Sequence, residues 1–210
     1  TLYQFYTSCE KMKLYATPLS HFSRKVRILL DLYQLQYEFQ DVGNVAEARS
    51  EIFADNPLMK VPVLVDGEDW LLESDHIAQY LVQKYDPSDR FSVSAKSIFD
   101  LNARAVMNSV MSEEVKMILA RRTSVPTEQY AFFDKALRAM EQGLGWLESN
   151  AEKFTPETPT YREFHFLCMW EHLAYYQVVP LPYVKLGAIA EKVAMNPVVS
   201  ETAPQKLKPK

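Results

Sequence analysis

Residues 56–81 read NPLMKVPVLVDGEDWLLESDHIAQYL and combine a hairpin with the start of a helix. The apolar run VPVLV over 61–65 is compact enough for a buried strand. Asp66-Gly67 is a typical hairpin turn, and DWLL over 69–72 predicts the returning strand. The pattern SDHIAQYLVQKY then predicts an amphipathic helix over 74–85. This stretch therefore predicts an antiparallel β-β-α unit.

The residues before this unit predict a parallel β-α-β arrangement. KLYAT over 13–17 and QYEFQDV over 36–42 indicate strands on either side of a helix over 21–34. Apolar side chains in that helix recur at three- and four-residue spacing and so share one face. A second helix is expected over 46–56, AEARSEIFADN. The order β-α-β-α-β-β-α predicts one α/β domain.

Composition changes after this helix, because DPSD is a polar, proline-containing linker and no strand pattern follows it. We expect an all-helical second domain with helices over 93–121, 127–150, 160–177 and 183–194, followed by an extended tail. The expected organisation is an N-terminal extension over 1–11, an α/β domain over 12–85, a linker over 86–92 and a helical domain over 93–210.

Overall composition excludes several classes of function. The 210 residues carry 23 basic and 27 acidic side chains, a net charge of −4, without a dominant basic stripe, which disfavours nucleic-acid binding. No apolar stretch approaches the roughly 20 residues of a membrane span. The two cysteines, Cys9 and Cys168, cannot form a disulfide framework and fit a reducing, cytoplasmic compartment.

Three stretches now carry a family signal: KLYATPLSHFSRKVRILL, NPLMKVPVLVDG and ESDHIAQYL occur in this order before an all-helical half. Together they resemble the first domain of the cytosolic glutathione transferases, with a motif like that of the serine-type bacterial, theta and zeta members. The resemblance implies a thioredoxin-like first domain and a helical-bundle second domain. It also implies glutathione as co-substrate, no metal, and a homodimer.

The activity implied is conjugation of glutathione to a small hydrophobic electrophile in detoxification. Two alternatives stay open. One is a non-catalytic binding or regulatory protein with the same fold. The other is a glutathione-dependent isomerase, peroxidase or ether-cleaving enzyme, since the helical domain sets the electrophile.

The resemblance implies glutathione contacts around Pro62. A proline inside an apolar strand cannot donate to a ladder, so it marks an edge or a break. In similar proteins this proline is cis, and the backbone of the preceding residue, Val61 here, pairs with the cysteinyl backbone of glutathione as an added strand would. Lys60 could meet the glycyl carboxylate, or could be a solvated loop lysine. Family members usually have glycine where this chain has Met59.

Glu73 and Ser74 precede the helix over 74–85. The resemblance implies that Ser74, expected at the N-cap, holds the γ-glutamyl carboxylate, because a helix N-terminus presents unpaired N–H groups. Glu73 suits the γ-glutamyl ammonium. The alternative is that Ser74 only caps the helix.

The glutathione sulfur must react as a thiolate, so a hydrogen-bond donor is needed near the first helix. In a gapless match through RKVRILL, the tyrosine of tyrosine-type enzymes falls on Ala16, which cannot donate. The serine of serine-type enzymes falls on Ser20, the predicted catalytic residue. His21 and Ser23 are alternates, and Ser20 could instead be a simple N-cap.

Phe22, Met107 and Met111 are the candidates for the electrophile pocket, although helix packing alone also explains the methionine pair. His165, Cys168 and His172 share one helix face and are zinc-ligand types. The first and last are separated by about 10 Å of helix rise, too far for one ion, so a core face is the better interpretation.

Overall fold

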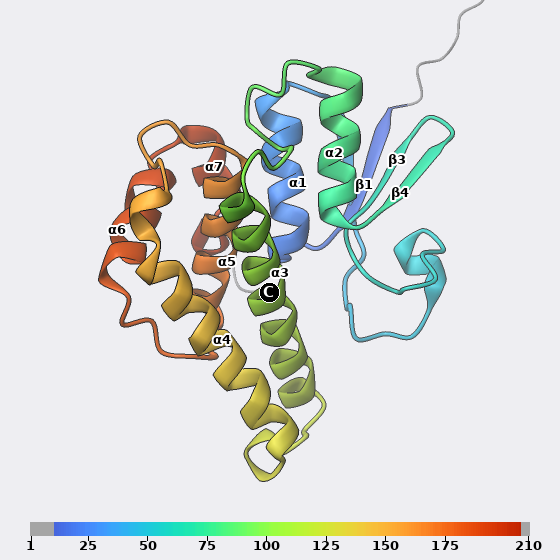
Figure 1. Ribbon diagram of the computed structural model, residues 1–210. Helices are drawn as coiled ribbons and strands as arrows, with labels where there is room; N and C mark the ends of the chain where they lie inside the picture. The colour runs from blue at the N-terminus through green and yellow to red at the C-terminus, as the bar shows by residue number, and fades with distance from the viewer. Residues whose placement is uncertain (1–10, 207–210) are drawn as a thin grey trace, which may run out of the picture.

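The structure is a computed structural model that describes residues 11–206. The first domain contains a four-stranded sheet of order β2-β1-β3-β4 with helices packed on it (Figure 1). Its elements are β1 (Met12–Ala16), α1 (His21–Leu32), β2 (Tyr37–Asp41), β3 (Val63–Asp66), β4 (Asp69–Leu72) and α2 (Ser74–Tyr85). β1 pairs parallel with β2 and antiparallel with β3, as the two sequence units predict.

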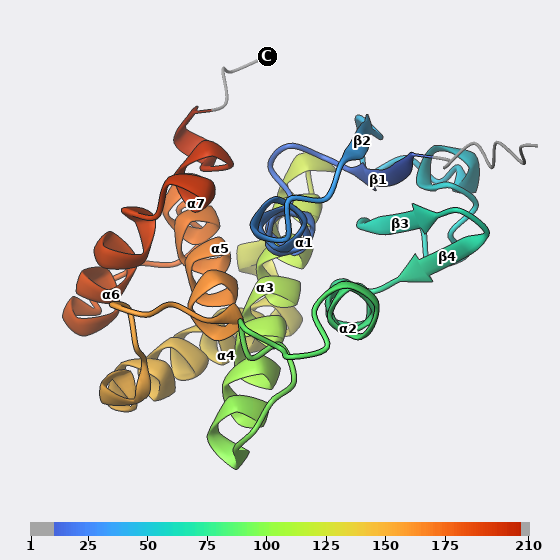
Figure 2. The same cartoon turned by 90° about the horizontal axis from the view of Figure 1, so that it is seen from above.

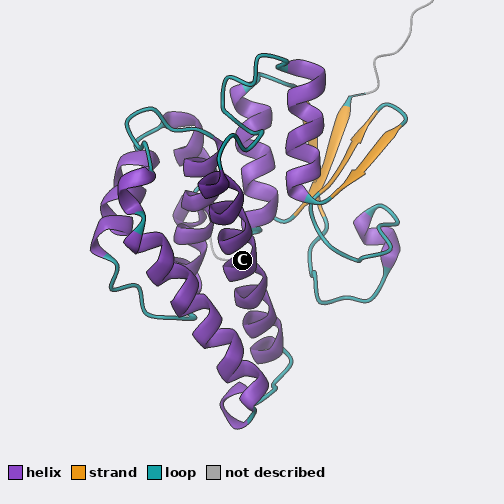
Figure 3. Ribbon diagram, in the orientation of Figure 1, coloured by secondary structure: helices purple, strands orange, loops and turns teal. Residues whose placement is uncertain are grey.

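The second part of the chain is all-helical among the described residues (Figure 3). Its helices are α3 (Ile98–Arg122), α4 (Ala131–Ser149), α5 (Tyr161–Tyr176), α6 (Val184–Ala194) and α7 (Pro197–Glu201), with short 3₁₀ turns at Thr127–Gln129, Ala151–Lys153 and Pro204–Lys206. The predicted α/β domain followed by an all-helical domain is confirmed. No helix in residues 11–206 combines the length and apolar character that crossing a membrane requires.

The two domains pack through helices. α1 and α2 lie between the sheet and the C-terminal helices, and α5 packs directly beside α1 (Figures 1 and 2). One apolar core fills the space between the sheet and helices α1 and α2. A second apolar core surrounds α5. Residues 164–169 of α5 are all buried, as expected for a helix enclosed on every side.

Local signals explain most helix starts. Ser97 begins α3 by accepting the backbone N–H of Asp100 at 3.1 Å. Asn196 begins α7 by accepting the N–H of Val198 at 3.1 Å, and Pro197 occupies the first helical position, where its missing N–H costs nothing.

Two sequence expectations were wrong. The helix over 46–56 is a loop with one 3₁₀ turn, Ser50–Phe53 (η1), which ends where Ala54 and Asp55 take positive φ of 52° and 56°. Residues 196–206 are not extended as expected for the tail, because they form α7 and a 3₁₀ turn. The buried guanidinium of Arg24 bonds Val199 O and Thr202 Oγ1 and holds this segment on α1.

Candidate functional site

A cavity of about 1380 Å³ lies between the two domains. One side is formed by the β1–α1 loop, the loop over 41–48, residues 58–62 and the start of α2. The other side is formed by α3 and the end of α5. Six of the residues singled out in the sequence line the first side together: Ser20, Lys60, Val61, Pro62, Glu73 and Ser74.

The Val61–Pro62 bond is cis, as the family resemblance implied. Val61 precedes β3, and no turn or loop hydrogen bond of the described residues uses its backbone. The preceding loop is held by Asn56, whose amide donates to Lys60 O at 2.8 Å and whose Oδ1 accepts Leu58 N–H at 2.8 Å. Met59 adopts φ 49°, a conformation that glycine takes without strain.

Ser74 is the first residue of α2 and is buried, while the N-cap is Glu73 rather than Ser74 as expected. Glu73 is exposed and takes φ 64° and ψ 123°. A non-glycine residue at positive φ stores backbone strain that persists only where other contacts impose it. Glu73 therefore combines a strained backbone with a carboxylate directly before the first residue of α2.

Replacing Glu73 with glycine is expected to raise the free energy of unfolding by about 1 kcal/mol, because glycine tolerates positive φ. Urea denaturation followed by circular dichroism measures the change. Glu73→Ala is the matched control, since it removes the carboxylate but keeps the strained backbone. Equal stability of the two variants would contradict the explanation.

Ser20 is the N-cap of α1. Its Oγ accepts the backbone N–H of Ser23 at 3.1 Å and the hydroxyl of Ser23 at 3.0 Å. With its oxygen used twice as an acceptor, the Ser20 hydroxyl has its own hydrogen left to donate, and the residue lines the cavity. Ser23 is fully buried and does not line the cavity.

Only one of the three residues expected in an electrophile pocket lines the cavity. Phe22 lines the cavity, whereas Met107 and Met111 are buried in the core of the helical domain and do not line it. Both methionines face the packed side of α3. The α3 residues that do line the cavity are Asn108, Ser112, Val115, Ile118, Leu119, Ala120 and Arg122.

A buried polar cluster, here called the His–Glu–His cluster, lies at the cavity wall and consists of His21, Glu114 and His172. Glu114 Oε2 is 3.4 Å from His21 Nε2 and 2.8 Å from His172 Nδ1. The two imidazoles stack with centroids 3.9 Å apart. Both histidines line the cavity and Glu114 lies behind them, fully buried.

The electrostatics of the cluster keep the carboxylate ionised. Burial, followed by the proximity of His172, lowers the pKa of His21 to about 4. Burial opposes ionisation of Glu114, but its contacts with His172 and His21 outweigh burial and hold its pKa below the ordinary value. Sequence reasoning missed Glu114. The signal available was an acidic residue inside the apolar stripe of α3.

Residues 14–89 match the family model described as "Glutathione S-transferase, N-terminal domain". A zeta-class glutathione S-transferase of Euphorbia esula is 42% identical over 77 residues, which are 36% of this chain and 34% of that protein. The chain thus matches about a third of the length of that relative. Glutathione S-transferase Z2 of Arabidopsis thaliana is 27% identical over 93% of this chain and 92% of its own length.

Solved structures show the same fold. A glutathione S-transferase from Methylobacterium radiotolerans, in complex with glutathione sulfonate, superposes with a TM-score of 0.78 at 17% identity, over 95% of this chain and 99% of the other. One from Pseudomonas fluorescens with bound glutathione gives a TM-score of 0.77 at 20% identity, over 92% and 99%.

The fold and the matched domain define a protein of the glutathione transferase architecture, with a thioredoxin-like domain followed by a helical one. Residues 14–89 match the N-terminal domain of the glutathione S-transferase family, and the chain as a whole has the fold of solved members of that family.

Proposed function

We propose that the protein binds glutathione, stabilises its thiolate and adds the sulfur to a small apolar electrophile. The observation that carries the proposal is that the Ser20 hydroxyl, the Val61 backbone and the Glu73-Ser74 pair line one cavity. A tripeptide with a thiol, two carboxylates and an ammonium needs these kinds of groups. The proposal extends to a cytoplasmic homodimer, which rests on the family resemblance.

Each end of glutathione has a partner in this proposal. The cysteinyl backbone pairs with Val61 as an additional strand beside β3. The γ-glutamyl carboxylate meets the N-terminus of α2 at Ser74, and its ammonium meets Glu73. The exposed Lys60 is the cation for the glycyl carboxylate. The strain at Glu73 supports a functional reason for keeping a carboxylate there.

The sulfur lies near Ser20 in this proposal. A thiol has an ordinary pKa of about 8.5, so a single donor together with a helix N-terminus is enough to enrich the thiolate at neutral pH. Ser20 is favoured over Ser23, because Ser23 is buried and its hydroxyl donates to Ser20. The electrophile lies against Phe22 and the apolar side chains of α3.

A second candidate is glutathione-dependent isomerisation. Two observations favour it: zeta-class enzymes are among the relatives, and the His–Glu–His cluster offers acid–base groups on the electrophile side of the cavity. Peroxidase, ether-cleaving and non-catalytic binding roles remain alternatives from the sequence. None of them is favoured by a particular contact.

The test is glutathione binding by calorimetry and turnover of a chloronitroaromatic substrate. Ser20→Ala is expected to reduce kcat/KM about 10²-fold, because the thiolate loses its donor. The pKa of the bound thiol, read from the pH dependence of the rate, should return toward the ordinary thiol value.

Ser23→Ala is the comparison variant. A smaller loss than in Ser20→Ala supports Ser20 as the donor, whereas the reverse order assigns the donor to Ser23. A wild-type protein that neither binds glutathione nor turns over the substrate would overturn the proposed function.

A further inference from the structure

The His–Glu–His cluster joins three helices at the cavity wall. His21 is the first residue of α1, Glu114 belongs to α3 and His172 to α5. All three are at least 95% buried, and Glu114 Oε2 is shared by His21 Nε2 and His172 Nδ1. Burying three ionisable side chains together is costly, so their convergence beside a cavity points to a function.

One hydrogen bond assigns the roles of the two rings. The backbone N–H of Phe22 donates to His21 Nδ1 at 3.1 Å, so Nδ1 is unprotonated and the hydrogen of the neutral ring is on Nε2, facing Glu114. His172 presents Nδ1 to the same carboxylate oxygen at 2.8 Å. His172 is therefore the ring that can take up a proton beside Glu114, with Nε2 as its second nitrogen.

The surroundings of His172 allow it to exchange a proton with a bound molecule. The ring lines the cavity and packs between His21 and Tyr176, whose ring centroid is 4.7 Å away. Tyr176 also lines the cavity, and its hydroxyl accepts Arg122 at 3.0 Å. A carboxylate that holds one imidazole nitrogen orients the ring and stabilises its charged form.

We propose that His172, oriented by Glu114, is the catalytic acid that protonates the second substrate when glutathione adds to a carbon–carbon double bond conjugated to a carbonyl. The inference rests on the proposed function. Glu114 is a positioning residue, and His21 completes the stack that fixes the ring.

The step balances without another reagent. The thiolate forms a C–S bond to the β-carbon, and the electron pair of the double bond moves into the carbonyl group to give an enolate. The imidazolium of His172 transfers its proton to the enolate, and the proton released when the thiol ionised restores the imidazolium. Thiol and unsaturated carbonyl thus give a thioether. Substitution on a chloronitroaromatic ring expels chloride and has no such proton requirement.

Two histidines and a glutamate are also a zinc-type donor set. The rings, however, are stacked with only 20° between their planes, and a metal must lie in the plane of each imidazole that binds it. In addition, His21 Nε2 carries the ring hydrogen and so has no free lone pair to bind a metal. The geometry therefore favours proton transfer, and metal binding is an outcome that the test separates.

The experiment compares addition to an unsaturated ketone with substitution on a chloronitroaromatic, both with glutathione. His172→Gln is expected to lower kcat for addition by about 10²-fold, the usual contribution of a general acid. Its kcat for substitution should fall by a factor at least about ten times smaller than that for addition. In His172→Ala, imidazole in the buffer should restore part of the addition rate. Glu114→Gln should lower kcat for addition with little change in KM, since it misorients the acid without removing a substrate contact.

Glu113→Gln is the matched control, because Glu113 pairs with Lys116 on α3 and does not line the cavity. It should leave both reactions unchanged. Equal losses of addition and substitution in the His172 variants, with no rescue by imidazole, would overturn the inference. So would stoichiometric zinc in the wild type that is lost in His172→Gln, together with addition that a chelator abolishes. Absence of glutathione binding in the wild type would instead overturn the proposed function.

Discussion

Replacing Asp75 with asparagine will lower the free energy of unfolding by about 3–5 kcal/mol, the usual cost of removing one partner of a buried ion pair. Lys25 is fully buried, and its Nζ lies 2.8 Å from Asp75 Oδ1. The same carboxylate accepts the Tyr161 hydroxyl at 2.7 Å and the Asn108 amide at 2.6 Å, so it links α2 to α3 and α5. Without it, the ammonium has no charged partner in the domain interface. Urea denaturation measures the loss.

Two comparisons isolate the buried charge. The double variant Lys25→Met/Asp75→Asn should recover a large part of the stability, because it leaves no unpaired charge. Glu157→Gln removes a partner of the exposed pair with Lys192 and should change stability by less than about 0.5 kcal/mol. A loss in Asp75→Asn no larger than in Glu157→Gln would show that the buried pair does not hold the domains together.

The same variant has a defined pH dependence. Burial lowers the pKa of Lys25, while Asp75 raises it, so removing Asp75 lowers it further. Between this lowered pKa and the ordinary lysine pKa of about 10, the unfolded chain binds more protons than the folded variant, so the stability of the variant rises with pH over that range. The deficit relative to the wild type should therefore be smaller at pH 10 than at pH 7.

In the wild type, Asp75 has its pKa held well below the ordinary value despite burial, chiefly by Lys25, so its contribution is lost as pH falls below about 4.

Much of the fold was predictable because its signals are local. Asp66-Gly67 between two apolar strands specifies a hairpin wherever it occurs, and the spacing of apolar residues over 21–34 specifies one buried helix face. The segment 46–56 has a helix-like composition. Its backbone is nevertheless set by the positive φ of Ala54 and Asp55, which the sequence does not reveal.

Residues of the candidate site could be proposed from the sequence where one short motif contains them, but not where distant helices converge. Ser20, Val61 and Ser74 each belong to a recognisable stretch. The His–Glu–His cluster depends on how α1, α3 and α5 cross, and periodicity cannot give that crossing. The sequence pattern also grouped His172 with His165 on one helix face. In the structure, His165 contacts Lys25 and Met111 and is not part of the cluster.

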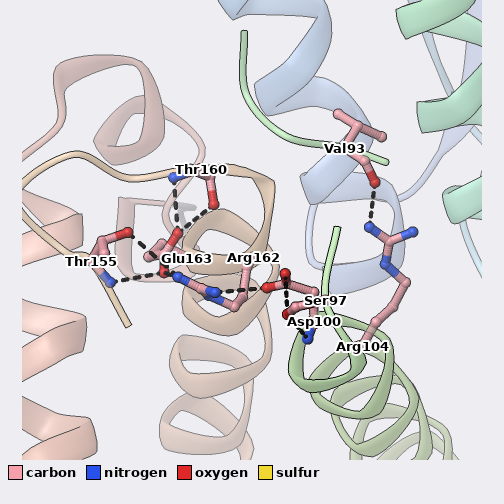
Figure 4. Close-up of polar contacts among 8 residues, drawn as sticks. All are labelled: Val93, Ser97, Asp100, Arg104, Thr155, Thr160, Arg162 and Glu163. Carbon is pink, nitrogen blue, oxygen red and sulfur yellow. Dashed lines mark hydrogen bonds and ion pairs between the residues drawn. The ribbon is translucent and has the colours of Figure 1, made fainter. Parts of the chain in front are cut away.

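Replacing Glu163 with alanine is expected to lower the free energy of unfolding by about 3 kcal/mol. Glu163 is fully buried and accepts Thr160 N–H at 2.9 Å, the Thr160 hydroxyl at 2.6 Å and Thr155 N–H at 3.0 Å (Figure 4). The Thr160 and Glu163 pair is a capping box at the start of α5, the helix around which the second core forms. Alanine leaves these donors unsatisfied, at about 1–3 kcal/mol for each one that stays buried.

The acceptor role can be separated from the charge of Glu163. Arg162 also bonds this carboxylate and continues to Asp100 of α3, 2.7 Å away (Figure 4). Glu163→Gln keeps one acceptor oxygen but loses the charge, so it should cost about 1 kcal/mol, between the wild type and Glu163→Ala. Glu152→Ala, at an exposed position nearby, should cost less than about 0.5 kcal/mol. If thermal and urea denaturation place Glu163→Gln level with Glu163→Ala, the charge on Glu163 stabilises the start of α5 and the capping box contributes little.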